Sequence, residues 1–159
     1  MLGIDKQNQF SRLTSNTYGG KSGSITITTK LLNLDGGIVA TNNFGLSKSN
    51  DITVKADKIN MTGGGQITSL TLSDGDGGKI NINTDTIFIA GTTGPGLVNL
   101  EIKGFVFENL QSAIATISFA KGAAGNISVV ANDLILDDRG GISAGTAGKA
   151  PAGNISMLL

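Results

Sequence analysis

The chain has no cysteine and no histidine among its 159 residues. Without cysteine it can form no disulfide bridge, no thiolate nucleophile and no cysteine-ligated metal site. Without histidine it lacks the commonest general base and the commonest side-chain metal ligand. Ser-His-Asp and Cys-His catalysis are therefore excluded, and the sequence predicts a protein that is not an enzyme.

Several other residue classes are scarce. Tryptophan is absent, tyrosine occurs once, and proline occurs only as Pro95 and Pro151. Twelve basic residues balance twelve acidic ones, so no basic patch indicates nucleic-acid binding. No apolar run reaches the length of about 18 residues that a membrane span needs. Residues 1–10 lack the pattern of a signal peptide, so an export signal is expected outside this sequence.

Glycine, in contrast, makes up 24 residues, about twice the usual share of ~7%. Among these glycines an Ile-x-Ile triplet, or a close variant, recurs five times. The triplets begin at Ile25, Ile52, Ile80, Ile127 and Ile155, at intervals of 27, 28, 47 and 28 residues. A fixed period in this range indicates a solenoid, in which each repeat stacks on its neighbours.

Two further apolar pairs recur with each triplet. The second pairs begin at Leu32, Ile59, Ile87 and Leu134, and the third pairs at Ile38, Ile67, Ile114 and Ile142. Residues two apart share one face of a strand, so each set should stack as an inward ladder. Lys30, Asp57, Asp85 and Asn132 mark the turn before the second strand. Glycines that favour positive φ mark the next turn, at Gly36-Gly37, Gly63-Gly64-Gly65 and Gly140-Gly141.

This alignment predicts an all-β fold, a single-stranded parallel β-helix with about 27–28 residues and three strands per coil. One segment spans residues 1–159. It has a partial first coil (1–22), coils starting near residues 23, 50, 78 and 125, and a partial last coil (153–159). The competing interpretation is a glycine-rich β-sandwich, which does not explain agreement at three positions per coil.

The 47-residue interval contains an insert at residues 91–109. Alternating apolar residues and the Phe105-Val106-Phe107 run indicate a hairpin or flap, which we expect to fold over the outward Phe88 and bury it. The alternative is one extra coil without a loop. Phe88, Phe105, Phe107 and Phe119 are the candidate partner-contact residues, and the other interpretation is a small apolar cluster beneath the insert.

Acidic side chains suggest little chemistry. Asp74 and Asp76 lie in a Gly/Asp-rich loop, and they are the candidate ligands if calcium binds. The pattern occurs once, whereas calcium β-rolls repeat it, so no metal or other cofactor is expected. Asp137, Asp138 and Arg139 form one acid/base cluster, which we interpret as a solvated turn. A carboxylate pair for polysaccharide cleavage remains an alternative.

The segment Gly-Asn-Ile-Ser-Val-x-Ala-Asn-Asp-Leu-Ile-Leu-x-Asp-x-Gly-Gly-Ile-Ser-Ala-x-Thr, residues 125–146, resembles repeats of filamentous haemagglutinin-like exoproteins of the two-partner-secretion type. The resemblance covers about residues 13–157. It implies a right-handed β-helix that is exported through an outer-membrane pore of a Gram-negative bacterium, cyanobacteria included. The family's secretion domain, with its Asn-Pro motif, is not present, so an internal segment of a larger fibre or a truncated relative is expected.

We therefore expect a structural or adhesive segment of a secreted or cell-surface protein, a rod that displays contact loops. Expected partners are glycans or a host or neighbouring cell surface, the secretion pore during export, and other copies of the chain bound end to end. No nucleic acid and no membrane span are expected. The alternative function is a carbohydrate-active or glycan-binding β-helix of the pectate-lyase-like architecture.

Overall fold

The computed structural model describes residues 2–3, 11–20, 23–94, 100–102, 105–107 and 110–159. These residues form strands, turns and loops, and no helix. The strands are β1 (Leu2–Gly3), β2 (Arg12–Thr17), β3 (Ile25–Asp35), β4 (Ile38–Asn43), β5 (Ile52–Thr62), β6 (Gln66–Thr71), β7 (Ile80–Ala90), β8 (Leu100–Ile102), β9 (Phe105–Phe107), β10 (Ala113–Ser118), β11 (Ile127–Asp137), β12 (Gly141–Thr146) and β13 (Ile155–Leu158).

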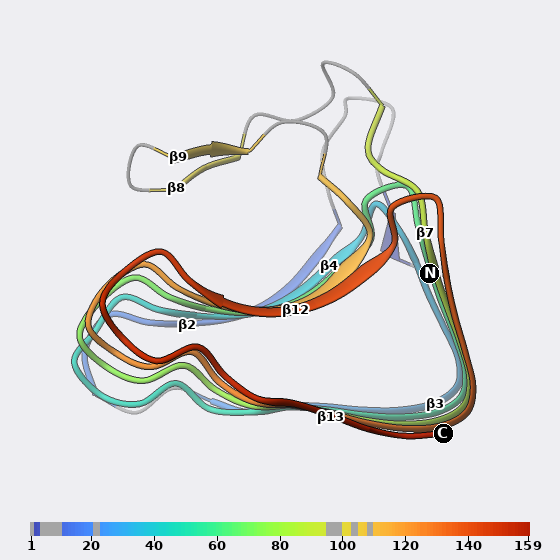
Figure 1. Ribbon diagram of the computed structural model, residues 1–159, viewed down its shortest axis with the longest axis horizontal. Coiled ribbons are helices and arrows are strands. Elements are labelled where there is room, and N and C mark those ends of the chain that lie inside the picture. The colour runs from blue at the N-terminus through green and yellow to red at the C-terminus, as the bar shows by residue number, and fades with distance from the viewer. Residues whose placement is uncertain (1, 4–10, 21–22, 95–99, 103–104, 108–109) are drawn as a thin grey trace.

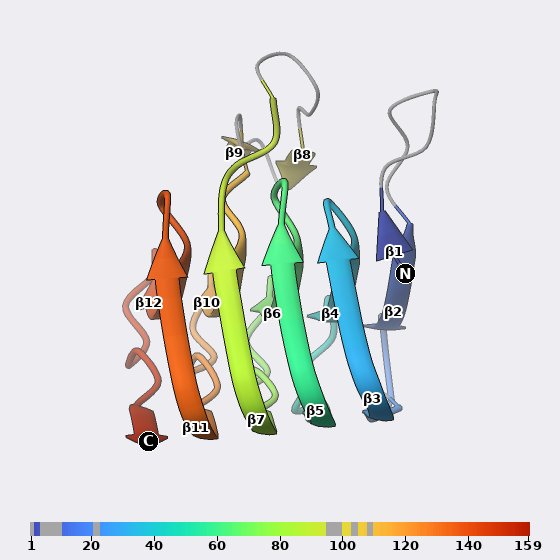
Figure 2. The same ribbon diagram turned by 90° about the vertical axis from the view of Figure 1, so that its right-hand side faces the viewer.

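Two parallel sheets build a β-solenoid, as the sequence predicted. One sheet has the strand order β1-β3-β5-β7-β11-β13, and the other has the order β12-β10-β6-β4-β2. Viewed along the axis, the chain runs anticlockwise while successive coils come towards the viewer (Figure 1), so the solenoid is right-handed. Figure 2 shows β3, β5, β7 and β11 side by side and pointing in the same direction.

Each coil has three sides, and the first two belong to one continuous strand. The 11-residue strands β3, β5, β7 and β11 turn a corner midway, as Figure 1 shows at the lower right. We call their two halves the first and second sides, and the sheet containing β4 and β6 the third side. The pairing between neighbouring long strands skips one position, which Lys30, Asp57, Asp85 and Asn132 occupy. These are the four residues that the sequence placed at this turn.

The inward ladders of the first two sides are confirmed. Ile25, Ile52, Ile80, Ile127 and Ile155 pair in register along the first side. Leu32, Ile59, Ile87 and Leu134 do so along the second side. Ile52, Ile59, Ile80 and Ile87 have no exposed surface. Parallel strands stack about 4.8 Å apart, so these aliphatic side chains pack continuously along the axis.

The predicted third ladder was wrong in its first member. Val39, not Ile38, pairs in register with Ile67, while Ile38 pairs with Gln66. The ladder continues through Ile114 and Ile142 as predicted. The reason is a shorter corner: the turn between β3 and β4 has one residue fewer than the turn between β5 and β6. Side chains alternate along a strand, so the shift exchanges which of two neighbouring residues points inward.

Positive φ at the corner after the second side is confirmed only in part. Gly36, Gly63 and Gly64 have φ of 67°, 55° and 82°. In the last complete turn, however, Asp138 and Arg139 take the left-handed conformation, with φ of 36° and 65°. The glycine that follows them, Gly140, is required by space instead, because a Cβ there would lie 1.9 Å from the carbonyl oxygen of Ile89 in the coil below.

The insert forms the predicted hairpin, because β8 and β9 pair antiparallel. An extra parallel coil is therefore excluded for these residues. Residues 95–99, 103–104 and 108–109 of the predicted flap lie outside the described residues. The hairpin lies beyond the third side of the coil in Figure 1, not over the second side that carries Phe88. Three outward residues of the third side are buried: Ala40, Thr68 and Ala115.

Truncation of an inward ladder residue tests the register. Leu34 is completely buried, whereas Leu31, on the same strand, is 49% exposed. We expect Leu34→Ala to lower the free energy of unfolding by about 2–5 kcal/mol, because it leaves a cavity in the core. Leu31→Ala should cost less than about 1 kcal/mol. Equilibrium denaturation by urea measures both, and equal losses would show that the register is wrong.

Substitution of Gly64 tests whether the corner after the second side needs a glycine. An added Cβ would lie 2.4 Å from Cγ2 of Thr93 and 2.8 Å from the carbonyl oxygen of Leu110, at a positive φ that disfavours L side chains. We expect Gly64→Ala to destabilise the protein by at least about 2 kcal/mol. Gly145→Ala, which meets nothing within 4 Å, is the matched control and should change stability by less than about 0.5 kcal/mol. A shift in melting temperature for both variants would contradict this account.

Candidate functional site

The four candidate contact phenylalanines do not form one patch. Phe88 lies on the second side, where it pairs in register with Asn60 and Ile135. Phe119 directly follows β10, at the end of the third side that is farther from the second side. There its amide donates to the carbonyl oxygen of Thr71. Phe105 and Phe107 belong to β9, and their side chains lie outside the described residues. Phe88 also stays partly exposed, so the predicted burial under the insert was wrong.

Phe88 instead lines a groove on the outer surface of the second side. The groove has a volume of about 390 Å³ and is lined by Asn33, Leu34, Asp35, Asn60, Thr62 and Phe88. These residues come from three successive coils, on β3, β5 and β7. Asn33 and Asp35 lie two apart on one strand, as do Asn60 and Thr62 on the next, so each pair faces the same way. The groove is the candidate functional site.

Hydrogen bonds between coils hold the floor of the groove. The amide nitrogen of Asn60 donates to the side-chain oxygen of Asn33 over 2.9 Å. The hydroxyl of Thr62 donates to Oδ1 of Asp35, also over 2.9 Å. Both bonds join residues at equal positions of neighbouring coils, where the strand spacing brings short polar side chains into contact. The floor is therefore a fixed polar surface beside the ring of Phe88.

A column of large apolar residues, which the sequence reasoning missed, lies where the third side ends. Tyr18, Phe44, Leu72 and Phe119 each follow a third-side strand, and ladder hydrogen bonds continue through the last three positions. The rings of Tyr18 and Phe44 stack with centroids 4.8 Å apart and planes 6° apart. Tyr18 is 73% exposed, whereas Leu72 is buried. The recurrence of large apolar residues one position after the third strand was visible in the sequence.

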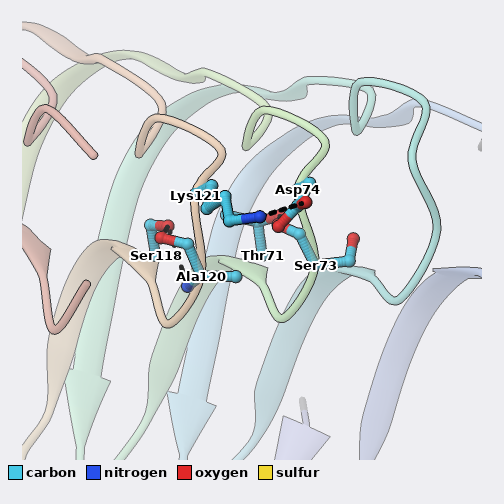
Figure 3. Close-up of polar contacts among 6 residues, drawn as sticks. All are labelled: Thr71, Ser73, Asp74, Ser118, Ala120 and Lys121. Atoms are coloured by element: carbon cyan, nitrogen blue, oxygen red, sulfur yellow. Dashed lines mark hydrogen bonds and ion pairs between the residues drawn. The ribbon is translucent and has the colours of Figure 1, made fainter. Parts of the chain in front are cut away.

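The loops beside this column are held by buried polar residues. Thr71 donates to the carbonyl oxygen of Gly75, and Ser118 donates to that of Gly122, at equal positions of two coils. Asn43 has the same place one coil earlier and donates to Ser47. Figure 3 shows Thr71 and Ser118 on neighbouring coils under their loops. These inward hydroxyl and amide groups satisfy loop carbonyls that would otherwise be buried without a partner.

The two candidate calcium ligands have other partners. Oδ2 of Asp74 lies 3.3 Å from Nζ of Lys121, in an exposed ion pair between coils (Figure 3). Oδ1 of Asp76 accepts from the amide of Ala123 over 2.9 Å, again across coils. Asp51 and Asn126 accept from the backbone of the next coil in a similar way. Asp74 and Asp76 thus tie adjacent loops together.

The acid/base cluster is an exposed turn. Asp137, Asp138 and Arg139 lie on the surface, and the carboxylate of Asp137 accepts from the amide of Asp138 over 2.8 Å. Among the described residues no group of three or more acidic side chains is arranged to hold a metal ion. In the same part of the chain no helix has the length and apolar character of a membrane span.

Comparisons of this chain with protein-family models, with characterised proteins and with solved structures found no match.

The loop hydrogen bonds are testable with residues drawn in Figure 3. Thr71→Val keeps the shape of a fully buried side chain but leaves the carbonyl of Gly75 without its donor. We expect a loss of about 1–3 kcal/mol in the free energy of unfolding. Asp74→Asn breaks only the exposed ion pair with Lys121 and should cost less than about 0.5 kcal/mol. If thermal denaturation shows the two variants to be equally stable, the buried hydroxyl does not organise the loop.

Proposed function

We propose that the chain is a structural, adhesive segment of a secreted or cell-surface exoprotein of the filamentous haemagglutinin-like kind. The observation that carries the proposal is the right-handed parallel solenoid itself (Figure 1), in which each strand of the two large sheets pairs only with strands of adjacent coils. The resemblance of residues 125–146 to two-partner-secretion repeats supports it. An outer-membrane pore of a Gram-negative bacterium is the proposed export route.

Stiffness and display are the proposed mechanism. Main-chain hydrogen bonds join every coil to the next, so stability adds up coil by coil and the stack resists bending. Side chains on the outer surface, the loops after the third side and the β8–β9 hairpin are then held at fixed positions along a rod. At the C-terminal end of the stack, Leu136 on β11 and Ile155 and Met157 on β13 are 40–51% exposed. These side chains suit the proposed end-to-end contact with a further coil.

Glycan binding is the second candidate function, and the groove on the second side favours it. Cleavage of a glycan normally uses two carboxyl groups about 5–10 Å apart. Asp35 is the one carboxylate among the described residues that line the groove. We therefore propose that any sugar bound there is held and not cut.

Surface labelling of the source bacterium tests the proposed location. Lysine side chains such as Lys121, which is 84% exposed, are available to an amine-reactive biotin reagent that does not cross membranes. We expect an antibody against this chain to detect biotinylated protein on intact cells or protein in the medium. A cytoplasmic enzyme is the control and should remain unlabelled. Recovery of the chain only after lysis, and unlabelled, would contradict the proposal.

A further inference from the structure

We propose that the groove on the second side is a binding site for a neutral oligosaccharide, with the ring of Phe88 against the sugar's C–H face and Asn33, Asp35 and Asn60 at its hydroxyl groups. The inference deepens the proposed contact function and rests on it, because it names the class of ligand that the rod would hold.

The polar floor of the groove retains capacity to bind hydroxyl groups. Asn60 donates to Asn33, so the amide NH₂ of Asn33 and the carbonyl oxygen of Asn60 have no partner among the described residues. Oδ2 of Asp35 is likewise left after Oδ1 accepts from Thr62. A fixed donor and two fixed acceptors lie on neighbouring coils about 4.8 Å apart. A hydroxyl group is both donor and acceptor, so adjacent hydroxyls of one sugar can satisfy all three.

Phe88 supplies the apolar part of the site. Along one outward column the residues are Asn33, Asn60, Phe88 and Ile135, so two short polar side chains are followed by two apolar ones. The ring therefore borders a polar floor, which gives one small groove both kinds of surface. A pyranose ring has the matching pattern, with C–H groups on a face and hydroxyls around the edge. Covering an exposed aromatic face with C–H groups is favourable because both leave water.

Charge decides which sugars fit. Asp35 is the one charged residue among the described residues that line the groove. The negative charge of Asp35 repels the carboxylate of a uronic acid, whereas its carboxylate oxygens accept hydrogen bonds from neutral hydroxyls. From Asn33 to Phe88 the site spans two coil steps, about 10 Å, which suits a short oligosaccharide. Because the groove is open, we expect dissociation constants of about 0.1–1 mM.

The experiment is titration calorimetry of the folded chain with a panel of tetrasaccharides. Four are neutral (based on glucose in α and in β linkage, on mannose and on N-acetylglucosamine), and tetragalacturonate is the acidic comparison. Phe88→Ala and Asn60→Ala test the two surfaces of the groove. Asn81→Ala, on an outward position of the first side in β7, is the matched control. Tyr18→Ala tests the exposed stack with Phe44 as a rival site. Circular dichroism verifies that every variant keeps its strand content.

We expect at least one neutral tetrasaccharide to bind, Phe88→Ala and Asn60→Ala to weaken it about tenfold or more, and Asn81→Ala and Tyr18→Ala to leave it unchanged. Any of three results overturns the inference. The first is that no neutral sugar binds at about 5 mM, a concentration well above the expected dissociation constants. The second is that binding survives both groove substitutions, or is lost in Tyr18→Ala. The third is that tetragalacturonate binds more tightly than every neutral sugar. None of these results alters the outcome of surface labelling, so the two proposals fail separately.

Discussion

The parallel main-chain ladder between successive coils is the constraint on which the rest of the structure depends. It fixes residues of equal position at about 4.8 Å from one another, so each side chain packs against the side chain at the equal position one coil away. Isoleucine on isoleucine then fills the axis at Ile52, Ile80 and Ile127. The same spacing lets Asn60 reach Asn33, and Thr62 reach Asp35. The same strand register therefore produces both the packing of the core and the hydrogen-bonded floor of the groove.

This register explains how much of the fold could be predicted. Inward ladders and the corner at Asp57 and Asp85 follow from repeated spacing, because a solenoid converts sequence period directly into spatial position. The third ladder failed at Ile38 because one corner is a residue shorter. The spacing already carried the signal, since Ile38 lies 14 residues before the next triplet and Ile67 lies 13 before its own. A β-strand tolerates no such shift, because alternate side chains face opposite ways.

The candidate site was harder to predict than the core. Phe88 stood out as an outward aromatic, but Asn33 and Asn60 look like ordinary solvent-facing residues until their column is aligned with it. The insert was expected over Phe88 because this aromatic side chain, at an outward position of the adjacent strand, would otherwise be exposed. In the structure the hairpin lies beyond the third side instead (Figure 1). No spacing rule gives the direction in which a hairpin leaves a corner, since its contacts are not repeated from coil to coil.

The corner between the second and third sides shows how such a scaffold can gain specificity without losing its register. The chain leaves the coil at Gly91, whose φ is 79°, and returns at Leu110. Across this gap the amide of Thr93 donates to Leu110 and that of Ser112 donates to Gly91, so the neck of the insert is closed by main-chain bonds. Ile114 then pairs with Ile67 as if the corner were short. Because the neck satisfies its own hydrogen bonds, the ladder above and below it does not depend on the length or sequence of the insert. Corners of this kind are therefore the positions at which a solenoid can acquire new surface while its core and its grooves stay unchanged.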